Sequence, residues 1–282
     1  SAVTIVDAGA HVLPRAAAAA AAIVSRRLAA DGVRLVHGAR ITRAARDGDG
    51  AVLHYEVGGK RHTLACDAIL VGVGRAPNTD GLGLEAAGIA YDRSGVTVDD
   101  HLRTTNPRVY AAGDIASRFK FTHTADALAR IVLTNALFLG RKTASALHVP
   151  WCTYTTPEIA HVGLYEAEAT ARGLAVDAIT IPLADVDRAV LDGDDEGFLR
   201  VVVKRGTDRI LGATLVAAHA GDMISEITLA MVGGLGLGTI ANVIHPYPTQ
   251  AEVVKKAGDT YNRTRLTPTV RKIFAWWLST RR

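Results

Sequence analysis

Short apolar runs and one helical stretch open the chain. The runs Val3–Val6 and Val33–Val36 are rich in β-branched residues, which predicts two strands. The alanine-rich stretch from about Ala16 to Ala30 between them predicts a helix. A strand, a helix and a second strand in this order form a right-handed βαβ crossover, so we expect a parallel sheet.

The following residues continue with strand-like patterns. Three runs predict a small antiparallel meander, with strands at about 41–45, 51–57 and 61–66. The apolar run 68–74 then predicts a buried parallel strand that ends in a glycine turn. A second block begins near Asn78, with a strand at Val109–Ala112 and a long helix at about His123–Leu147.

Pro150 marks a further boundary. Beyond it the pattern predicts strands near 160–162, 176–181, 198–204 and 210–217, and helices near 222–231 and 249–256. Strands and helices that do not alternate strictly are typical of an α+β domain. The predicted fold class is therefore α/β followed by α+β, in three blocks at 1–77, 78–149 and 150–282.

Composition narrows the class of protein. With 282 residues, 49% of them apolar, the chain can bury a substantial core. Its net charge of +4 is spread out, and no basic stretch is interleaved with aromatic residues, so nucleic acid is not expected as a partner. Residues 227–244 carry no charge, but glycines interrupt them, so we expect a buried helix and loop and no membrane span. The tail 274–282 suits either packing or contact with a membrane surface.

The two cysteines predict no disulfide framework. Cys66 and Cys152 lie far apart, and each has a histidine four residues upstream, His62 and His148. A zinc site needs three or four converging ligands, and no such group is evident, so no metal site is predicted. A reducing cytoplasm is the expected compartment.

Asp7 is the first candidate for ligand binding. An acidic residue at the end of the second strand of a dinucleotide-binding unit accepts hydrogen bonds from the adenosine ribose, and it repels a 2′-phosphate. Asp7 thereby favours NADH over NADPH, although a turn that starts before Gly9 explains the same residue. The glycine fingerprint expected about 20 residues before such an acid finds no room here. The later run Gly233–Gly238 follows a helical stretch and is interpreted as loop packing.

Two turns carry a more specific pattern. In the first, Gly74 and Arg75 end the run 68–74 where a parallel sheet presents its C-terminal edge to a ligand. In the second, Gly113 and Asp114 follow the small residues of the strand 109–112, which permits close approach of a backbone. Capping of the next turn is the structural alternative for Asp114.

In their order and distance these motifs resemble those of the flavin- and pyridine-nucleotide-dependent disulfide oxidoreductases, the family of dihydrolipoamide dehydrogenase, glutathione reductase and mercuric reductase. The resemblance runs from about Val3 to Arg265. It implies a partial NAD(P)-binding domain at 1–77, the C-terminal part of an FAD-binding domain at 78–149, and an α+β dimerisation domain at 150–282. The implied cofactors are FAD and NAD(P)H, and the implied partner is a second copy of the chain.

The resemblance also implies roles for single residues. Asp114 contacts the ribityl chain of FAD, and the helix starting near His123 points its positive end at the flavin, with Thr122 or Thr124 as its cap. His123 then lies near the flavin, although a surface histidine in a cap region is as compatible with the sequence.

The segment His245–Glu252 resembles the family's His-Pro-Thr motif and its following Glu, which act in acid-base catalysis at the partner's flavin and disulfide. Pro248, Thr249 and Glu252 align with that motif, which places Tyr247 at the catalytic histidine. A phenol has an ordinary pKa of about 10 and transfers protons poorly at neutral pH. Mercuric reductases also carry a Tyr here, yet the chain ends without their paired C-terminal cysteines. His245, two residues away, is either a participant or a structural histidine.

The sequence thus predicts the C-terminal portion of an FAD-dependent NAD(P)H:disulfide oxidoreductase of mercuric reductase-like type, with the redox cysteines and flavin fingerprint outside these residues. The chain alone is expected to be inactive. A noncatalytic dimerisation module and part of a flavin NADH oxidase are the alternatives, and the oxidising substrate is left open.

Overall fold

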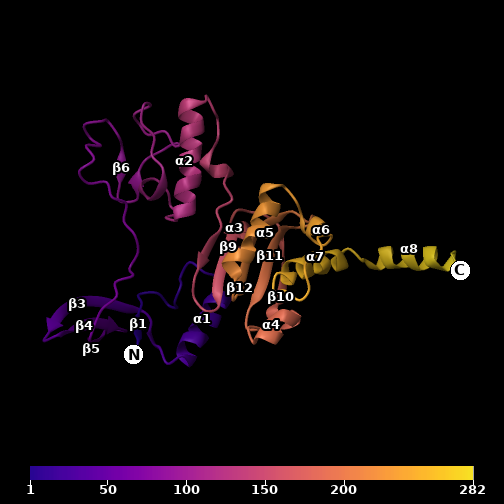
Figure 1. Ribbon diagram of the computed structural model, residues 1–282, viewed down its shortest axis with the longest axis horizontal. Helices are drawn as coiled ribbons and strands as arrows, with labels where there is room; N and C mark the ends of the chain where they lie inside the picture. Colours follow the sequence, from indigo (N-terminus) through magenta and orange to yellow (C-terminus); the bar gives the residue numbers. More distant parts are fainter. Residues whose placement is uncertain (282) are drawn as a thin grey trace. The chain divides into compact units, whose positions relative to one another are not determined.

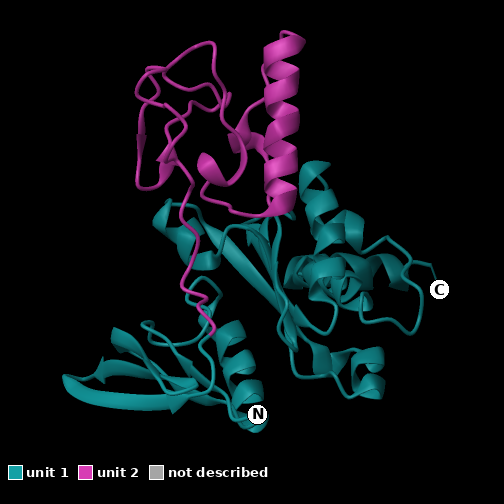
Figure 2. Ribbon diagram, turned by 60° about the vertical axis from the view of Figure 1, so that its left-hand side comes forward, with its two compact units in different colours: residues 1–69, 150–282 teal, residues 70–149 magenta. Residues whose placement is uncertain are grey.

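The computed structural model describes residues 1–281, which divide into two compact units (Figure 2). Residues 1–69 and the chain from residue 150 onward form the first unit, and residues 70–149 form the second. Figure 1 labels the elements along the chain. The architecture is α/β plus α+β, as predicted.

A βαβ crossover opens the first unit. It consists of β1 (Thr4–Val6), α1 (Ala18–Ala30) and β2 (Arg34–Val36). β1 and β2 pair in parallel, with Ile5 opposite Leu35, which confirms the predicted crossover. An antiparallel meander follows as predicted, formed by β3 (Ala39–Asp47), β4 (Gly50–Val57) and β5 (Lys60–Cys66).

The apolar run 68–74 differs from the prediction of a buried parallel strand. It has no regular secondary structure, and the side chains of Leu70 and Val73 are 98% and 83% exposed. A strand persists only where a neighbour satisfies its backbone N–H and C=O groups. Within the described residues the parallel sheet has only the two strands β1 and β2, so the run 68–74 has no such neighbour.

The second unit contains one long helix, α2 (Thr122–Leu137), which lies along one side of that unit (Figure 2). Its other elements are β6 (Tyr91–Asp92), β7 (Gly95–Val96) and the 3-10 turns η1 (Gly113–Ile115) and η2 (Ala144–Ala146). Of the strand predicted at 109–112, one bridge between Arg103 and Tyr110 forms, because the described residues supply no neighbouring strand that could pair with its full length. α2 ends ten residues earlier than predicted, and Leu139 just beyond it adopts a positive φ of 52° that a helix cannot continue.

A five-stranded antiparallel sheet forms the rest of the first unit. Its strands lie in the order β10-β11-β12-β9-β8. They are β8 (Trp151–Thr153), β9 (Glu158–Gly163), β10 (Val176–Pro182), β11 (Phe198–Lys204) and β12 (Ile210–Ala217). The sequence predicted four of these strands and missed β8, whose three residues are too few to show a period.

Helices cover one face of this sheet, chiefly α5 (Ala220–Val232) and α7 (Glu252–Thr264). The smaller helical elements are α3 (Glu166–Ala171), η3 (Leu183–Asp185), α4 (Asp187–Asp192) and α6 (Leu237–Ile240), and α8 (Pro268–Ser279) follows α7. Alternation along β9 sends Ala160 and Val162 into the main core under α5, while Ile159 faces the other side and packs against α1.

The charge-free stretch 227–244 forms the end of α5, a loop and α6. Ile227, Leu237 and Ile240 are buried in it. Leu229, Val232 and Ile244 are 69%, 66% and 93% exposed, so the predicted helix and loop form but are only partly buried. None of the helices within residues 1–281 is both long and apolar enough to cross a bilayer.

Candidate functional site

Asp7 lies directly after β1, at the end of the crossover where the sequence placed a ribose-binding acid. Its backbone N–H donates to the Val36 carbonyl at 2.9 Å, which fixes its position beside β2. One carboxylate oxygen accepts the Gly9 N–H at 2.5 Å. The Asp7 carboxylate therefore stabilises the turn, and the turn holds this side chain at the C-terminal end of β1.

Arg75 and Asp114 form an ion pair in the second unit, a contact that the sequence did not predict. The guanidinium Nη1 lies 3.2 Å from the Asp114 carboxylate. Lys120 Nζ donates to the Asp114 carbonyl at 2.6 Å, so both the backbone and the side chain of Asp114 are fixed by cations. The two glycines before them have positive φ values, 121° at Gly74 and 82° at Gly113, which L side chains rarely adopt.

The N-terminus of α2 follows this turn. Phe121 is its N-cap residue and provides no side-chain cap, so the prediction that Thr122 or Thr124 caps the helix was wrong. Both threonines lie inside the first turn, whose N–H groups have no partner within the helix. His123 lies there too, with its ring stacked on Phe121 at 5.3 Å.

Thr124 gives a direct indication of a missing polar partner. Its side chain is 2% exposed, and its Oγ1 is among the few buried polar side-chain atoms of the described residues without a hydrogen bond. It lines a pocket of about 460 Å³ together with Arg118 and Leu128. A helix N-terminus without a side-chain cap, the hydroxyl of Thr124 and an adjacent Gly-Asp turn fit an electron-rich ligand such as a flavin edge.

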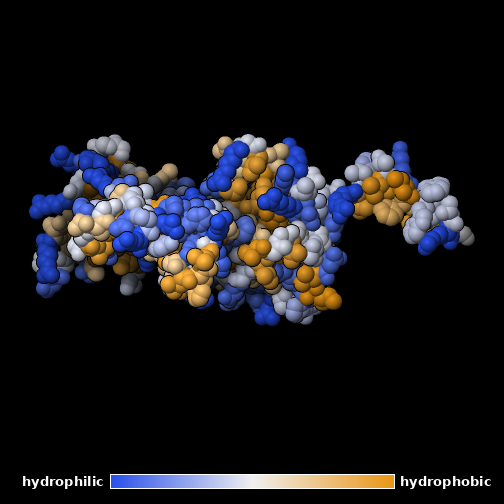
Figure 3. Space-filling view, turned by 90° about the horizontal axis from the view of Figure 1, so that it is seen from above, coloured by the Kyte–Doolittle hydropathy of each residue, from blue (hydrophilic) through white to orange (hydrophobic). Residues whose placement is uncertain are grey.

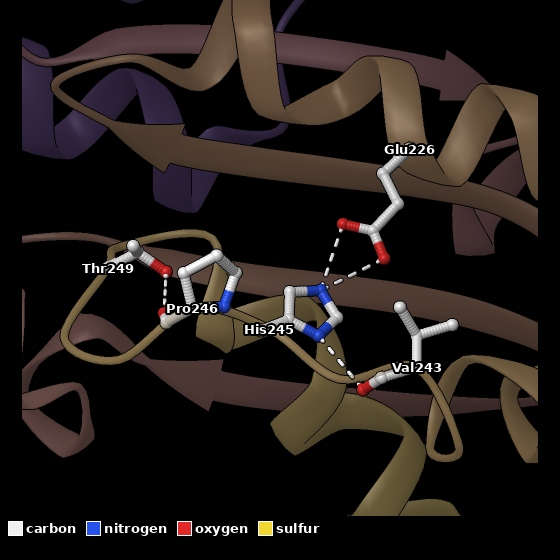
Figure 4. Close-up of polar contacts among 5 residues, drawn as sticks. All are labelled: Glu226, Val243, His245, Pro246 and Thr249. Carbon is white, nitrogen blue, oxygen red and sulfur yellow. Dashed lines mark hydrogen bonds and ion pairs between the residues drawn. The ribbon is translucent and has the colours of Figure 1, made fainter.

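His245 pairs with a carboxylate within the first unit (Figure 4). Its Nε2 lies 3.0 and 3.1 Å from the two carboxylate oxygens of Glu226 on α5, and its Nδ1 lies 3.2 Å from the Val243 carbonyl. The His245 side chain is only 6% exposed. Both ring nitrogens of His245 face acceptor oxygens, so the ring is held in one orientation between α5 and the Val243 carbonyl.

Tyr247 points its hydroxyl elsewhere. It donates to the carboxylate of Asp187, the first residue of α4, at 2.9 Å. That hydrogen bond, with the charge of Asp187, raises the pKa of the Tyr247 phenol. Glu252 begins α7 and lies 3.9 Å from Lys256 Nζ. The structure thus gives His245 and Tyr247 separate carboxylate partners, and Glu252 a cation.

Sequence reasoning missed Glu226 and Asp187, and it singled out Thr124 only as a possible helix cap. Glu226 is the last charge before the charge-free stretch 227–244, and a carboxylate at the edge of such a run is the signal that would have found it. Asp187 gave no comparable signal, because it lies among many exposed acids in the segment 185–196. Cys66 and Cys152 are free, and within residues 1–281 no three potential metal ligands converge.

Two family models match the chain in succession. Residues 1–129 match the pyridine nucleotide-disulphide oxidoreductase model, and residues 149–258 match the dimerisation domain of the same family.

Individual relatives agree with these models. Mercuric reductase from Staphylococcus aureus is 34% identical over 241 residues, which are 85% of this chain and 44% of that protein. Dihydrolipoyl dehydrogenase from Geobacillus stearothermophilus is 34% identical over 258 residues, 91% of this chain and 55% of that protein. The HOCl-induced flavoprotein disulfide reductase RclA from Escherichia coli has a similar structure, with a TM-score of 0.82 at 30% identity over 92% of this chain and 59% of that one. The chain spans about half the length of the curated relatives it matches.

Proposed function

This chain belongs to the pyridine nucleotide-disulphide oxidoreductase family, and we propose that it supplies the C-terminal portion of an FAD-dependent NAD(P)H:disulfide oxidoreductase of mercuric reductase-like type. The observation that carries the proposal is the Gly113–Asp114 turn beside the uncapped N-terminus of α2, with the orphaned hydroxyl of Thr124 next to it. When bound there, FAD supplies the capacity to accept hydride from a reduced nicotinamide.

Each candidate residue has a role in this proposal. Asp114 accepts hydrogen bonds from the ribityl chain, and the first-turn N–H groups of α2, next to His123, stabilise negative charge at the flavin's pyrimidine edge. Asp7 accepts hydrogen bonds from the adenosine ribose, which favours NADH. Gly74 lets Arg75 reach Asp114, so that the two turns support each other.

The sheet of the first unit serves as the dimerisation domain in a homodimer. His245 and Tyr247 then face the flavin site of the second copy, with Glu252 beside them, so that each site is completed by both copies. In this arrangement His245 transfers the proton, and the Glu226 carboxylate orients its imidazole. A reducing cytoplasm suits the two free cysteines.

A second function deserves the same test. The 282 residues by themselves act as a noncatalytic dimerisation module if the nucleotide-binding part stays incomplete. The run 68–74 is exposed, and the parallel sheet of the described residues has two strands; both support this alternative, since a dinucleotide site at a sheet edge requires neighbouring strands. A flavin NADH oxidase uses the same motifs, and a disulfide substrate distinguishes the reductase from it.

Flavin content tests the proposal. We expect the complete gene product to retain one FAD per chain and to oxidise NADH faster than NADPH, whereas the 282-residue chain purifies without stoichiometric FAD. Asp114→Asn removes a charge-assisted hydrogen bond and should weaken FAD binding about tenfold or more. Asp126→Asn is the matched control, since that carboxylate is exposed on α2 and pairs with Arg130. Unchanged flavin affinity in Asp114→Asn, measured by dialysis and visible absorbance, would contradict the assignment.

A further inference from the structure

The C-terminal helix α8 has an apolar surface that its own unit leaves uncovered. The helix starts cleanly, because the Thr267 hydroxyl accepts the Val270 N–H at 3.3 Å and Pro268 occupies the first turn. None of its residues is buried. The side chains of Phe274 and Trp276 are 49% and 67% exposed, and those of Ile273, Trp277 and Leu278 are also open to solvent.

These exposed side chains are ordered around the helix. At 3.6 residues per turn the half-buried Val270 and the exposed Ile273, Phe274 and Trp277 fall on one face, with the spacing i, i+3, i+4 and i+7. Lys272 falls on the opposite side. Figure 3 shows the helix at the right of the view, where hydrophobic residues gather between hydrophilic ones.

Charge distinguishes this segment from the rest of the chain. Residues 265–282 contain five of the 32 lysines and arginines and none of the 28 aspartates and glutamates. The remaining residues therefore carry 27 basic against 28 acidic side chains, so the chain's entire positive excess lies here. Two of the three tryptophans also lie here, and the guanidinium of Arg281 stacks over the Trp277 ring at 4.3 Å.

We propose that α8 binds in the plane of an anionic phospholipid surface, with Val270, Ile273, Phe274 and Trp277 inserted and the basic residues at the headgroups. Twelve residues span about 18 Å, too short for a hydrocarbon core of about 30 Å, so the helix lies on the membrane and does not cross it. Tryptophan and arginine favour this interface. Pairing with α8 of a second copy is disfavoured by electrostatic repulsion, because every charged side chain in both segments is positive.

Vesicle binding of the full chain tests this surface. The chain should sediment with vesicles of phosphatidylserine and phosphatidylcholine about tenfold more strongly than with pure phosphatidylcholine, and high salt should weaken this binding. Tryptophan emission should shift to the blue on binding. The double variant Phe274→Ser and Trp277→Ser, which removes two side chains of the inserted face, should lower the partition coefficient about tenfold or more. Leu137→Ser, another exposed apolar residue on a helix, should leave it unchanged.

Two results would overturn the proposal. One is equal binding to neutral and anionic vesicles, or none to either. The other is a loss of molecular mass in light scattering for Phe274→Ser and Trp277→Ser, without any effect on sedimentation with vesicles, which would show that α8 holds two copies together. The variants alter exposed side chains only, so circular dichroism should confirm an unchanged fold.

Discussion

Replacing His161 by glutamine is expected to remove a large part of the acid sensitivity of the first unit. His161 lies on β9 and is 3% exposed. Its Nδ1 lies 2.9 Å from the Thr214 hydroxyl and its Nε2 lies 3.1 Å from the Gly163 carbonyl. The neutral ring satisfies both contacts, with Nε2–H as the donor and Nδ1 as the acceptor. Tyr165 stacks on the ring at 3.8 Å, so water cannot solvate an added charge there.

The magnitude follows from the shift in protonation. Burial lowers the pKa of His161 from 6.5 to about 4. As the pH falls below 6.5, the unfolded chain takes up a proton that the folded chain does not bind, so stability is lost until the pH reaches about 4. At about 1.4 kcal/mol for each pH unit in this window, the loss is about 3 kcal/mol.

Urea unfolding between pH 7.5 and pH 4 measures this loss. Trp151 lies 5.6 Å from the His161 ring, so tryptophan fluorescence reports the surrounding structure. Between pH 7.5 and pH 4 the free energy of unfolding should fall by about 3 kcal/mol more for the wild type than for His161→Gln, even though the variant is less stable at pH 7.5. His62→Gln, which alters an exposed histidine on β5, should follow the wild-type profile. Parallel profiles for wild type and His161→Gln would refute the reasoning.

Three further changes probe the same unit. Leu215→Ala, at a fully buried position of β12, should lower the free energy of unfolding in urea by about 2–5 kcal/mol. Leu191→Ala, at a 73% exposed position, should lower it by less than about 0.5 kcal/mol. Equal losses of stability would contradict the assignment of Leu215 to the core. Gly163→Ala should lower the free energy of unfolding by more than about 2 kcal/mol, because its Cβ would lie 2.3 Å from the Leu211 carbonyl oxygen. Gly173 has a similar φ but open space around it, so Gly173→Ala should lower the free energy of unfolding less. Thermal unfolding can rank the two variants. Burial and the nearby Glu158 raise the pKa of the Cys152 thiol to about 12. In the variant Cys66→Ser, the remaining thiol should therefore react with a thiol reagent at pH 8 at about one tenth of the rate of free cysteine or less. An equal rate would show that Cys152 is accessible as a thiolate.

Local patterns determined the elements that carry their own signal. The βαβ crossover, the meander and four strands of the antiparallel sheet follow from short-range period and from turn residues, which act within a few positions. The two Gly-containing turns identified the family for the same reason, because a backbone that must approach a ligand closely requires glycine at a fixed place.

Pairing across the chain was decided only by the tertiary structure. Whether 68–74 becomes a strand depends on a neighbour, and its own apolar residues cannot supply one. His245 meets Glu226 across 19 residues, and Tyr247 meets Asp187 across 60, because the helices over the sheet bring these side chains together. The sequence by itself identified His245 and Tyr247 as candidates for proton transfer, because their side-chain chemistry is fixed by residue type. Long-range packing chose their partners, since contact in space has no fixed spacing along the chain.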